Sequence, residues 1–387
     1  MNVIDRIYEK INLEEGKIII EKFFLELYFE ERMSTKELSQ RLLIPIPLVT
    51  AIKKESIREN LIEQNNGIAL SLEGKDYVEN YLGYNGINKK EYKLLINKSD
   101  KSILTEVRKD IEIIFKNRPQ ADVTLDQSKC TVETAIDRVI MGLKKNSIIG
   151  KKVLCVGDDD LISVTTNVIL NKLFNNNVPY NTKIYVYDKD KRILEYIKNM
   201  ANIFELSSII CKELDLKKKT AQENIGIYDT VFTDPPYTIN GVELFLTRAV
   251  ENIKKQTGLY IFLSYAHKSQ DAMRLIENKI LNLGLSIYQI IPKFNEYEGA
   301  ELLGNKGQLI ILQTTKDTIN KSSKDYTNII YTGEIRQTRR KYKCKNCGKE
   351  FFVGIEEKYT TIEGLKEKKC PECKSDIFDL IEKVRKD

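Results

Sequence analysis

Tryptophan is absent from this chain of 387 residues, and histidine occurs once, at His267. A single histidine removes most histidine-based mechanisms, because a Ser-His-Asp triad or a histidine metal site would have to centre on that residue. No apolar run approaches the ~20 residues that a membrane-spanning helix requires. The first residues also lack the basic and apolar regions of a secretory signal. We therefore expect a cytoplasmic protein with no membrane partner, whose cysteines are reduced.

Length and charge narrow the class of protein further. A chain of this length accommodates one to three domains, each with a core of its own. Basic residues number 62 and acidic residues 56, which gives a formal net charge of +6. A charge this modest does not suit a protein that coats nucleic acid with its whole surface.

Residues 1–82 are typical of a winged helix-turn-helix unit. Ser34 and Glu37 are placed to form a capping box at the start of a short helix, and Asn65-Asn66-Gly67 indicates a hairpin turn. The helix that would read DNA mixes basic and acidic residues, namely Lys53, Lys54, Arg58, Glu55 and Glu59. A DNA-reading helix usually has a more one-sided basic face. We expect a packing or dimerisation role in a homodimer, with DNA binding as the alternative.

From Thr131 onward, helical and strand patterns alternate, as they do in a doubly wound α/β sheet. Residues 83–120 precede this region as a connector with one predicted helix over 103–115, and residues 121–318 form the α/β domain. The predicted strands cover 152–157, 183–188, 208–211, 228–233, 258–264, 285–292 and 308–314. A sheet of about seven strands predicts the Rossmann-like fold of the methyltransferase superfamily.

Two of the predicted strands stop abruptly at carboxylates. One apolar run is followed by Gly157-Asp158-Asp159-Asp160, and the other by Asp234-Pro235-Pro236-Tyr237. Buried parallel strands deliver such residues to the carboxyl edge of an open sheet. Four aspartates that converge on one crevice would attract a cationic substrate, and we expect an amine.

Two positions fit a nucleoside cofactor that lies across the first strands of the sheet. Asp188 ends the second strand, where a carboxylate binds both ribose hydroxyls, and Asp215 follows the third strand, where it can accept from an adenine amino group. The first loop has only Gly157 before its three aspartates, although a dinucleotide site usually has several glycines there. These aspartates would repel a pyrophosphate, which argues against NAD and FAD.

These motifs resemble the branched-chain polyamine synthases, or N(4)-bis(aminopropyl)spermidine synthases. The residues that carry the resemblance are Asp126-Gln127, Gly157-Asp158-Asp159-Asp160-Leu161, Asp234-Pro235-Pro236 and Lys293-Phe294-Asn295-Glu296-Tyr297. The resemblance covers about residues 15–315. It implies an enzyme that transfers aminopropyl groups from decarboxylated S-adenosylmethionine to spermidine and releases 5'-methylthioadenosine.

The resemblance also suggests roles for individual residues. Attack by an amine requires a neutral nitrogen, so a carboxylate must take its proton. Asp159, Asp160 and Asp234 are the catalytic candidates, with Asp159 or Asp160 as the base. The candidates for substrate binding are Asp158, Pro235, Pro236, Tyr237, Glu296 and Tyr297, and those for cofactor binding are Gln127, Gly157, Asp158, Asp188 and Asp215.

Four cysteines near the C-terminus form two C-x-x-C pairs, Cys344 with Cys347 and Cys370 with Cys373. This spacing predicts a zinc ribbon over residues 331–387, in which four thiolates bind a structural Zn²⁺. The segment from Arg336 to Lys345 is basic, which indicates either a solvated charge run or a contact with RNA, DNA or a partner.

Two other functions agree with parts of this pattern. Asp234-Pro235-Pro236-Tyr237 is similar to the motif with which amino-methyltransferases of nucleic acids hold an exocyclic amine, so methylation of such an amine by S-adenosylmethionine is the alternative reaction. A regulator that binds nucleic acid and senses a polyamine through an enzyme-like fold is the non-enzymatic alternative.

Overall fold

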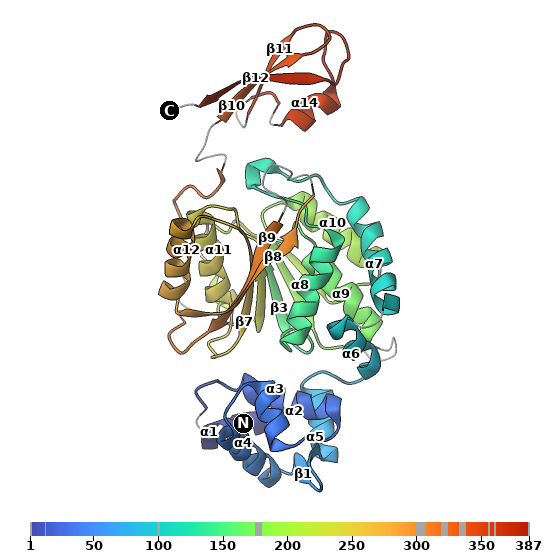
Figure 1. Cartoon of the computed structure of the whole chain (residues 1–387), viewed down its shortest axis with the longest axis vertical. Coiled ribbons are helices and arrows are strands. Elements are labelled where there is room, and N and C mark those ends of the chain that lie inside the picture. Colours follow the sequence, from blue (N-terminus) through green and yellow to red (C-terminus); the bar gives the residue numbers. More distant parts are fainter. Residues whose placement is uncertain are drawn as a thin grey trace.

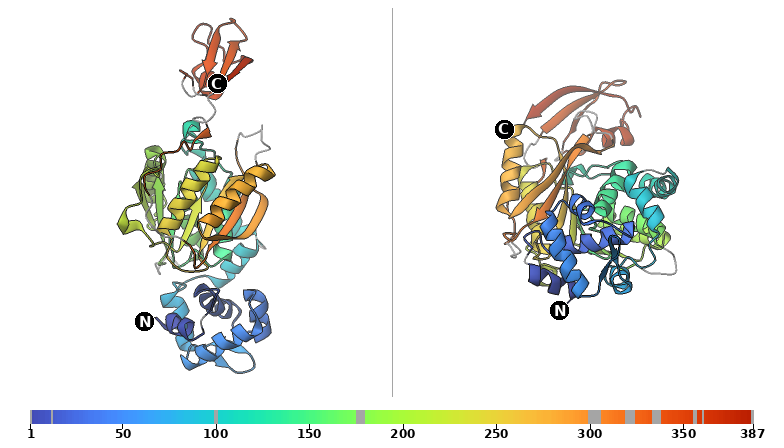
Figure 2. Two further views of the ribbon diagram at one scale, coloured as in Figure 1. Left: turned by 90° about the vertical axis from the view of Figure 1, so that its left-hand side faces the viewer. Right: turned by 60° about the horizontal axis from the view of Figure 1, so that its bottom comes forward.

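The computed structural model describes residues 2–11, 13–98, 101–174, 180–298, 306–318, 324–332, 338–354, 357–359 and 361–385. They form three parts along the long axis of the molecule, which are a helical N-terminal part, a central α/β part and a small C-terminal sheet (Figure 1). The side view shows the C-terminal sheet projecting beyond the central part, at the end opposite the N-terminal helices (Figure 2).

The N-terminal part combines short helices with a two-stranded hairpin. The predicted capping box is present, since the Ser34 hydroxyl accepts from the Glu37 amide at 3.2 Å and the Glu37 carboxylate accepts from the Ser34 amide at 2.8 Å. The hairpin turns at Asn66 and Gly67, both with positive φ, as such turns require. Its elements are α1 (Val3–Ile11), α2 (Ile18–Glu30), α3 (Thr35–Leu42), α4 (Ile46–Arg58), β1 (Ile62–Gln64), β2 (Ile68–Leu70), α5 (Leu72–Asp76) and the π-helical turn η1 (Tyr77–Tyr81).

The N-terminal part is packed against the central sheet, and one hydrophobic core includes residues of both. Gly150 has a φ of +70°, and a Cβ added there would lie 2.0 Å from the carbonyl oxygen of Leu82. Lys151 Nζ lies 2.5 Å from the Glu21 carboxylate across the same boundary. The N-terminal part is therefore joined to the central part by a shared core, a close backbone contact and an ion pair.

The central sheet has seven strands in the order β5-β4-β3-β6-β7-β9-β8. The strands are β3 (Lys152–Val156), β4 (Lys183–Asp188), β5 (Ile209–Glu213), β6 (Thr230–Thr233), β7 (Tyr260–Ala266), β8 (Leu285–Glu296) and β9 (Lys306–Thr314). The first five in space are parallel, whereas β9 is antiparallel to both β7 and β8. The seven predicted strands are all present, and β8 extends past its predicted end at 292.

Helices cover both faces of the sheet, with α11 and α12 on one side and α8, α9 and α10 on the other (Figure 1). These helices are α8 (Val132–Lys144), α9 (Ile162–Leu173), α10 (Lys191–Ile203), α11 (Ile239–Asn252) and α12 (Gln270–Asn282), and the 3₁₀ turns are η2 (Val123–Leu125) and η3 (Gln222–Asn224). Residues 153–156 of β3 are at most 1% exposed. A strand covered on both faces reads as a continuous apolar run, which explains the pattern of the sequence.

The connector contains two helices, α6 (Lys89–Asn97) and α7 (Lys101–Lys116), where the sequence analysis predicted one over 103–115. The prediction was incomplete because α6 is short and largely polar. Its start signal is present in the sequence, since the Asn88 side chain accepts from the Glu91 amide at 3.1 Å. Tyr92 and Leu95 bury the inner face of α6.

The C-terminal part is a three-stranded antiparallel sheet in the order β11-β10-β12, with a hydrophobic core of its own. Its elements are β10 (Thr338–Cys344), β11 (Glu350–Val353), α14 (Ile362–Lys368) and β12 (Phe378–Arg385). Arg336, at the start of the basic segment, lies outside the described residues.

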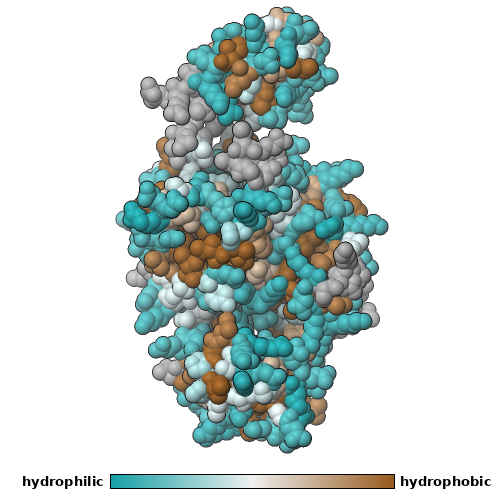
Figure 3. All heavy atoms as spheres, viewed as in Figure 1, coloured by the Kyte–Doolittle hydropathy of each residue, from teal (hydrophilic) through white to brown (hydrophobic). Residues whose placement is uncertain are grey.

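Hydrophilic residues cover most of the face shown in Figure 3, and a hydrophobic patch lies over the central part. Strand β8 is an edge of the sheet, and its Tyr288 and Ile290 side chains are exposed. Within the described ranges, no helix combines the length and the apolar character needed to cross a bilayer.

Candidate active site

A cleft opens at the carboxyl ends of β3, β4 and β6. Because β3 lies between β4 and β6, the residues that follow these strands meet at one edge of the sheet. The cleft encloses about 670 Å³ of atom-free space, including its open mouth. Its lining includes the candidates Gln127, Gly157, Asp159, Asp188, Asp215, Asp234, Pro235, Pro236 and Tyr237.

The three consecutive aspartates after β3 point in different directions. Asp158 is 2% exposed and accepts from the first amides of α9, with Ile162 N at 2.7 Å and Ser163 N at 3.2 Å from its oxygens. A carboxylate is favourable there because the N-terminus of a helix carries partial positive charge. Burial nevertheless raises the pKa of Asp158 to about 7. Asp158 therefore holds the loop against α9.

Asp160 is enclosed by protein donors. One of its oxygens accepts from Cys130 N at 2.8 Å, and the other accepts from the guanidinium of Arg138 at 2.6 Å. The residue is 3% exposed. Because both oxygens already bind the protein, Asp160 anchors the loop to α8.

Asp159 lies between these two residues, and its side chain faces the cleft. One of its oxygens lies 3.3 Å from the Ser128 amide, which is a long hydrogen bond. Burial and the nearby charges of Asp160 and Asp234 hold the pKa of Asp159 well above its ordinary value. A carboxyl group with a raised pKa that faces a cleft is suited to proton transfer near neutrality.

Asp234, directly after β6, is the second acidic group in the cleft. Its Oδ2 accepts from the Tyr297 hydroxyl at 2.6 Å and from Arg138 at 3.1 Å. Burial raises the pKa of Asp234 to about 7, against the opposing effect of Arg138. Asp159 and Asp234 are thus a pair of adjacent carboxyl groups that share one desolvated environment.

Arg138 is a central residue of this site that the sequence analysis missed. It is 2% exposed and lies on the inner face of α8. A signal existed, because Arg138 is a charged residue between the apolar residues Ala135, Val139 and Leu143 on the buried side of a predicted helix. A buried arginine needs acidic partners, and here the two loops supply them.

The candidates for cofactor binding lie on the side of the cleft toward β4. Asp188 accepts from the Asp158 amide at 2.9 Å and from the Asp190 amide at 2.8 Å, and its carboxylate keeps acceptor capacity for a ligand. Gln127 is fixed by a 3.1 Å bond from its Nε2 to Asp190. Gly157 has a φ of +73°, a conformation that favours glycine.

The structure does not bring all the candidates to the cleft lining. Glu296, at the end of β8, has a side chain that is 52% exposed and lies 3.7 Å from Lys306 Nζ. The Tyr297 hydroxyl donates to Asp234, and the Tyr297 ring packs edge-on against the ring of Tyr237. His267 accepts from the Lys293 amide at 3.2 Å at an exposed position.

Apolar residues complete the cleft, and the sequence analysis did not identify them. Phe245 comes from α11, and Ile330 and Tyr331 come from the segment 324–332 that follows the sheet. Two hydrogen bonds hold this segment on both sides of the cleft. The Thr238 hydroxyl donates to Ile330 O at 2.6 Å, and the Thr332 amide donates to the Asp126 carboxylate at 2.6 Å. It has no strand or helix periodicity, so its position depends on tertiary contacts alone.

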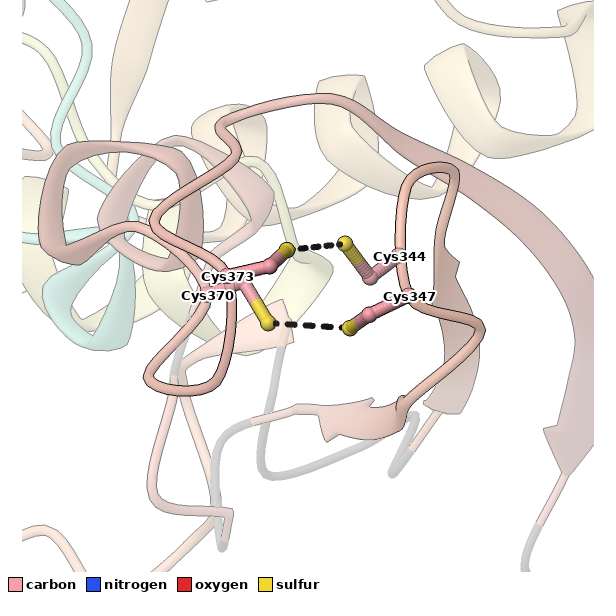
Figure 4. Close-up of side chains that lie close together, drawn as sticks. All are labelled: Cys344, Cys347, Cys370 and Cys373. Carbon is pink, nitrogen blue, oxygen red and sulfur yellow. Dashed lines mark hydrogen bonds between the residues drawn. The ribbon is translucent and has the colours of Figure 1, made fainter.

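The four C-terminal cysteines converge as their spacing predicts (Figure 4). Their sulfur atoms all lie within 4.8 Å of one another, with 3.5 Å between Cys344 and Cys373 and 3.5 Å between Cys347 and Cys370. Four thiolates around one Zn²⁺ at about 2.3 Å lie roughly 3.8 Å apart. The arrangement therefore fits a tetrahedral metal site.

The mixed seven-stranded sheet, with a cleft lined by carboxylates at the carboxyl ends of its parallel strands, defines an open α/β protein of the class that binds its ligands at this edge of the sheet. Residues 106–361 match the family model described as the branched-chain polyamine synthase A C-terminal domain. Because that match covers more than half of the chain, the chain belongs to the branched-chain polyamine synthase family.

Curated relatives agree with this family. An uncharacterized protein of Methanocaldococcus jannaschii is 32% identical over 369 residues, which cover 92% of this chain and 88% of the relative. The N(4)-bis(aminopropyl)spermidine synthase of the same organism is 29% identical over 259 residues, or 65% of this chain and 70% of that protein. The enzyme of that name from Thermococcus kodakarensis is 28% identical over 260 residues, with the same coverage.

A solved structure shows the same fold. The branched-chain polyamine synthase of Thermus thermophilus, in complex with N4-aminopropylspermidine and 5'-methylthioadenosine, superposes with a TM-score of 0.51 at 17% identity. The match covers 84% of this chain and 95% of that chain.

Proposed function

We propose that this protein is an aminopropyltransferase, which transfers aminopropyl groups from decarboxylated S-adenosylmethionine to spermidine and makes branched polyamines. Family membership supports the reaction, because two of the relatives are named N(4)-bis(aminopropyl)spermidine synthase. The observation that carries the proposal is the pair Asp159 and Asp234, two partly buried carboxyl groups with raised pKa values that face one cleft.

The proposed reaction needs one proton acceptor and no metal. An acceptor nitrogen with a free lone pair attacks the carbon next to the sulfonium sulfur, so a C–N bond forms while the C–S bond breaks. The C–S electron pair stays on sulfur, and 5'-methylthioadenosine leaves as a neutral thioether. The nitrogen must lose a proton, and we assign its removal to Asp159 because its side chain faces the cleft with one weak protein partner.

We assign the donor to the part of the cleft near β4 and the acceptor to the part near β6. Asp188 would accept from the ribose hydroxyls and Asp215 from the adenine amino group, with Gly157 and Gln127 beside them. Asp234, Pro235, Pro236 and Tyr237 would bind the acceptor amine. In this proposal Asp158, Asp160 and Tyr297 support the loops, and Glu296 stands at the rim, where a long polyamine can reach it.

The flanking parts have structural roles in this proposal. We infer that residues 1–82 are a winged-helix unit that packs on the sheet and takes part in a homodimer, and that residues 331–387 are a zinc ribbon with Cys344, Cys347, Cys370 and Cys373 as ligands. Zinc-bound thiolates require a reducing compartment, which supports the cytoplasm. Basic residues of β10 pair within the ribbon, Arg339 with Glu357 at 2.7 Å and Lys341 with Glu350 at 2.5 Å. These pairs do not favour a nucleic-acid partner.

The acceptor is the part of the proposal that most needs an experiment. The relative matched over 92% of this chain is an uncharacterized protein, and its organism also has a synthase that matches over 65%. The purified protein should be incubated with spermidine, spermine or putrescine and with either decarboxylated or ordinary S-adenosylmethionine, and the products identified by mass spectrometry.

A gain of one or two aminopropyl units on spermidine, with release of 5'-methylthioadenosine, is the expected result. Methyl transfer from ordinary S-adenosylmethionine to an exocyclic amine would support the alternative reaction suggested by the Asp-Pro-Pro-Tyr motif. Absence of aminopropyl transfer to every amine would refute the proposed function.

A further inference from the structure

Two carboxylates of the site, Asp160 and Asp234, form ion pairs with Arg138. Among the described residues, no other cation forms an ion pair with either of them. The Arg138 guanidinium donates to Asp160 at 2.6 Å and to Asp234 at 3.1 Å. The same group donates to Asn295 at 2.8 Å and to the Tyr297 hydroxyl at 2.9 Å. Arginine presents its donors in a fixed planar fork, so these contacts fix the positions of their partners.

The contacts of Arg138 join elements that are far apart in the sequence. The residue lies on α8, Asp160 on the loop after β3, Asp234 on the loop after β6, and Asn295 on β8. The two loops carry Asp159 and Asp234, the adjacent acidic residues of the cleft lining. Arg138 therefore links the two acidic loops in addition to the backbone pairing of β3 with β6.

The three carboxylates of the site differ in how many of their oxygens are already bound by the protein. Asp160 has both oxygens occupied, by Arg138 and by the Cys130 amide. Asp234 has Oδ2 occupied by Arg138 and Tyr297, and it still faces the cleft. Asp159 forms no ion pair with the residues that the structure describes, and it faces the same cleft.

We infer that Arg138 is a positioning residue that selects Asp159 as the proton acceptor, by binding Asp160 and Asp234 in their ionised form. This inference deepens the proposed function and rests on it for the identity of the reaction. A guanidinium stays protonated at all relevant pH values, so it favours the ionised form of each carboxylate that it touches. Asp159, which is not among the ion-pair partners of Arg138, is therefore the last of the three aspartates to ionise, and in its ionised form it is the strongest base of the three and takes the proton of the acceptor amine.

This arrangement also restricts the acceptor. Three aspartates and one arginine give the inner site two net negative charges instead of three when all four groups are charged. Asp234 remains available to an ammonium group, whereas Asp160 does not. The geometry fits an acceptor that places one cationic nitrogen near Asp234 and its reacting nitrogen near Asp159.

The test uses the full-length protein and compares Arg138→Gln and Arg138→Lys with the wild type. Arg118→Gln is the matched control, because Arg118 is also a buried arginine near Cys130, with its guanidinium 2.7 Å from Cys130 O, but its ion-pair partner is the exposed Glu298. Each variant is measured for kcat and KM of aminopropyl transfer over pH 6–10, and for affinity to 5'-methylthioadenosine. The nucleoside affinity reports whether the fold and the donor side of the cleft are intact.

We expect Arg138→Gln to lower kcat about 10- to 100-fold, in line with the loss of charge-assisted hydrogen bonds, and to move the acid limb of the kcat profile to higher pH. Arg138→Lys keeps the charge, so its acid limb should lie nearer to that of the wild type. The KM for the amine should not rise, since removal of a positive charge does not weaken attraction for a cation. Arg118→Gln should leave the acid limb in place.

An unchanged acid limb in Arg138→Gln, with nucleoside affinity retained, would overturn the inference. If the glutamine variant does not fold, a rise in the KM for the amine in Arg138→Lys with kcat unchanged would overturn the inference as well. NMR titration of ¹³C-labelled aspartate carboxyls, assigned with Asp159→Asn, tests the inference without turnover. If the wild-type protein transfers no aminopropyl group, the proposed function fails, and the titration still decides whether Asp159 is the last of the three to ionise.

Discussion

Asp159→Asn is the substitution that most directly tests the catalytic site. Asparagine has almost the same shape and can still accept the long bond from the Ser128 amide, so no large packing change is expected. It cannot take a proton from an amine. Loss of a general base typically costs a factor of about 10²–10⁴ in rate, which raises the barrier by roughly 3–5 kcal/mol.

The same substitution should increase the stability of the fold. Burial and neighbouring carboxylates raise the pKa of Asp159 above its ordinary value, so the folded protein holds a proton there that the unfolded chain has released. Stability of the wild type therefore falls as pH rises from the ordinary aspartate pKa toward the raised one. Asparagine does not ionise, so the variant should be more stable at and above neutral pH, and the difference should disappear as pH falls to about 4.

Asp160→Asn is the matched control, since it changes the adjacent residue in the same way. It removes one charge from the buried contact with Arg138, which lies 2.6 Å away. Loss of one partner of a buried ion pair costs roughly 3–5 kcal/mol, so this variant should unfold at a lower temperature. Rates from mass spectrometry and unfolding temperatures from pH 4 to pH 9 are the measurements. An Asp159→Asn enzyme that works within about threefold of the wild-type rate would refute the assignment of the base.

Three further substitutions test the other parts of the proposal. Asp188→Ala should lower the affinity for 5'-methylthioadenosine about 10- to 100-fold through loss of charged hydrogen bonds, and calorimetry that finds wild-type affinity would contradict the ribose assignment. Cys370→Ser should reduce bound zinc to near zero per chain and expose the ribbon to protease while the central part resists; retention of stoichiometric zinc would argue against the four-cysteine site. Gly150→Ala should lower the free energy of unfolding by about 2 kcal/mol or more, because its Cβ would lie 2.0 Å from Leu82 O at a φ of +70°; an unchanged urea midpoint would show that the N-terminal part is not fixed at this position.

Much of the α/β fold could be predicted from local sequence patterns. Continuous apolar runs such as residues 153–156 indicated buried parallel strands, and the carboxylates after them indicated the carboxyl edge of the sheet. The incomplete prediction of the connector has a physical reason as well. Helix α6 is mostly polar and is recognised by its Asn88 cap and its two buried residues Tyr92 and Leu95, which form a weaker pattern than the longer α7.

The spacing of the cysteines was sufficient to predict that the four sulfur atoms converge, because two C-x-x-C pairs can close a tetrahedron in few arrangements. The aspartates after β3 were different. The three residues are identical in the sequence, so their chemistry alone does not distinguish their roles. Only the turn after β3 decides that Asp158 faces α9, Asp160 faces α8 and Asp159 faces the cleft.

Periodicity and spacing over a few residues were enough to predict the order of the strands along the chain, the acidic character of the sheet edge and the convergence of the four cysteines. The tertiary structure alone decided that Arg138 joins Asp160 to Asp234 and that residues 324–332 reach the cleft. Those contacts connect positions 22 to more than 150 residues apart. No local pattern encodes such a distance, because it follows from the packing of helices and loops around the completed sheet.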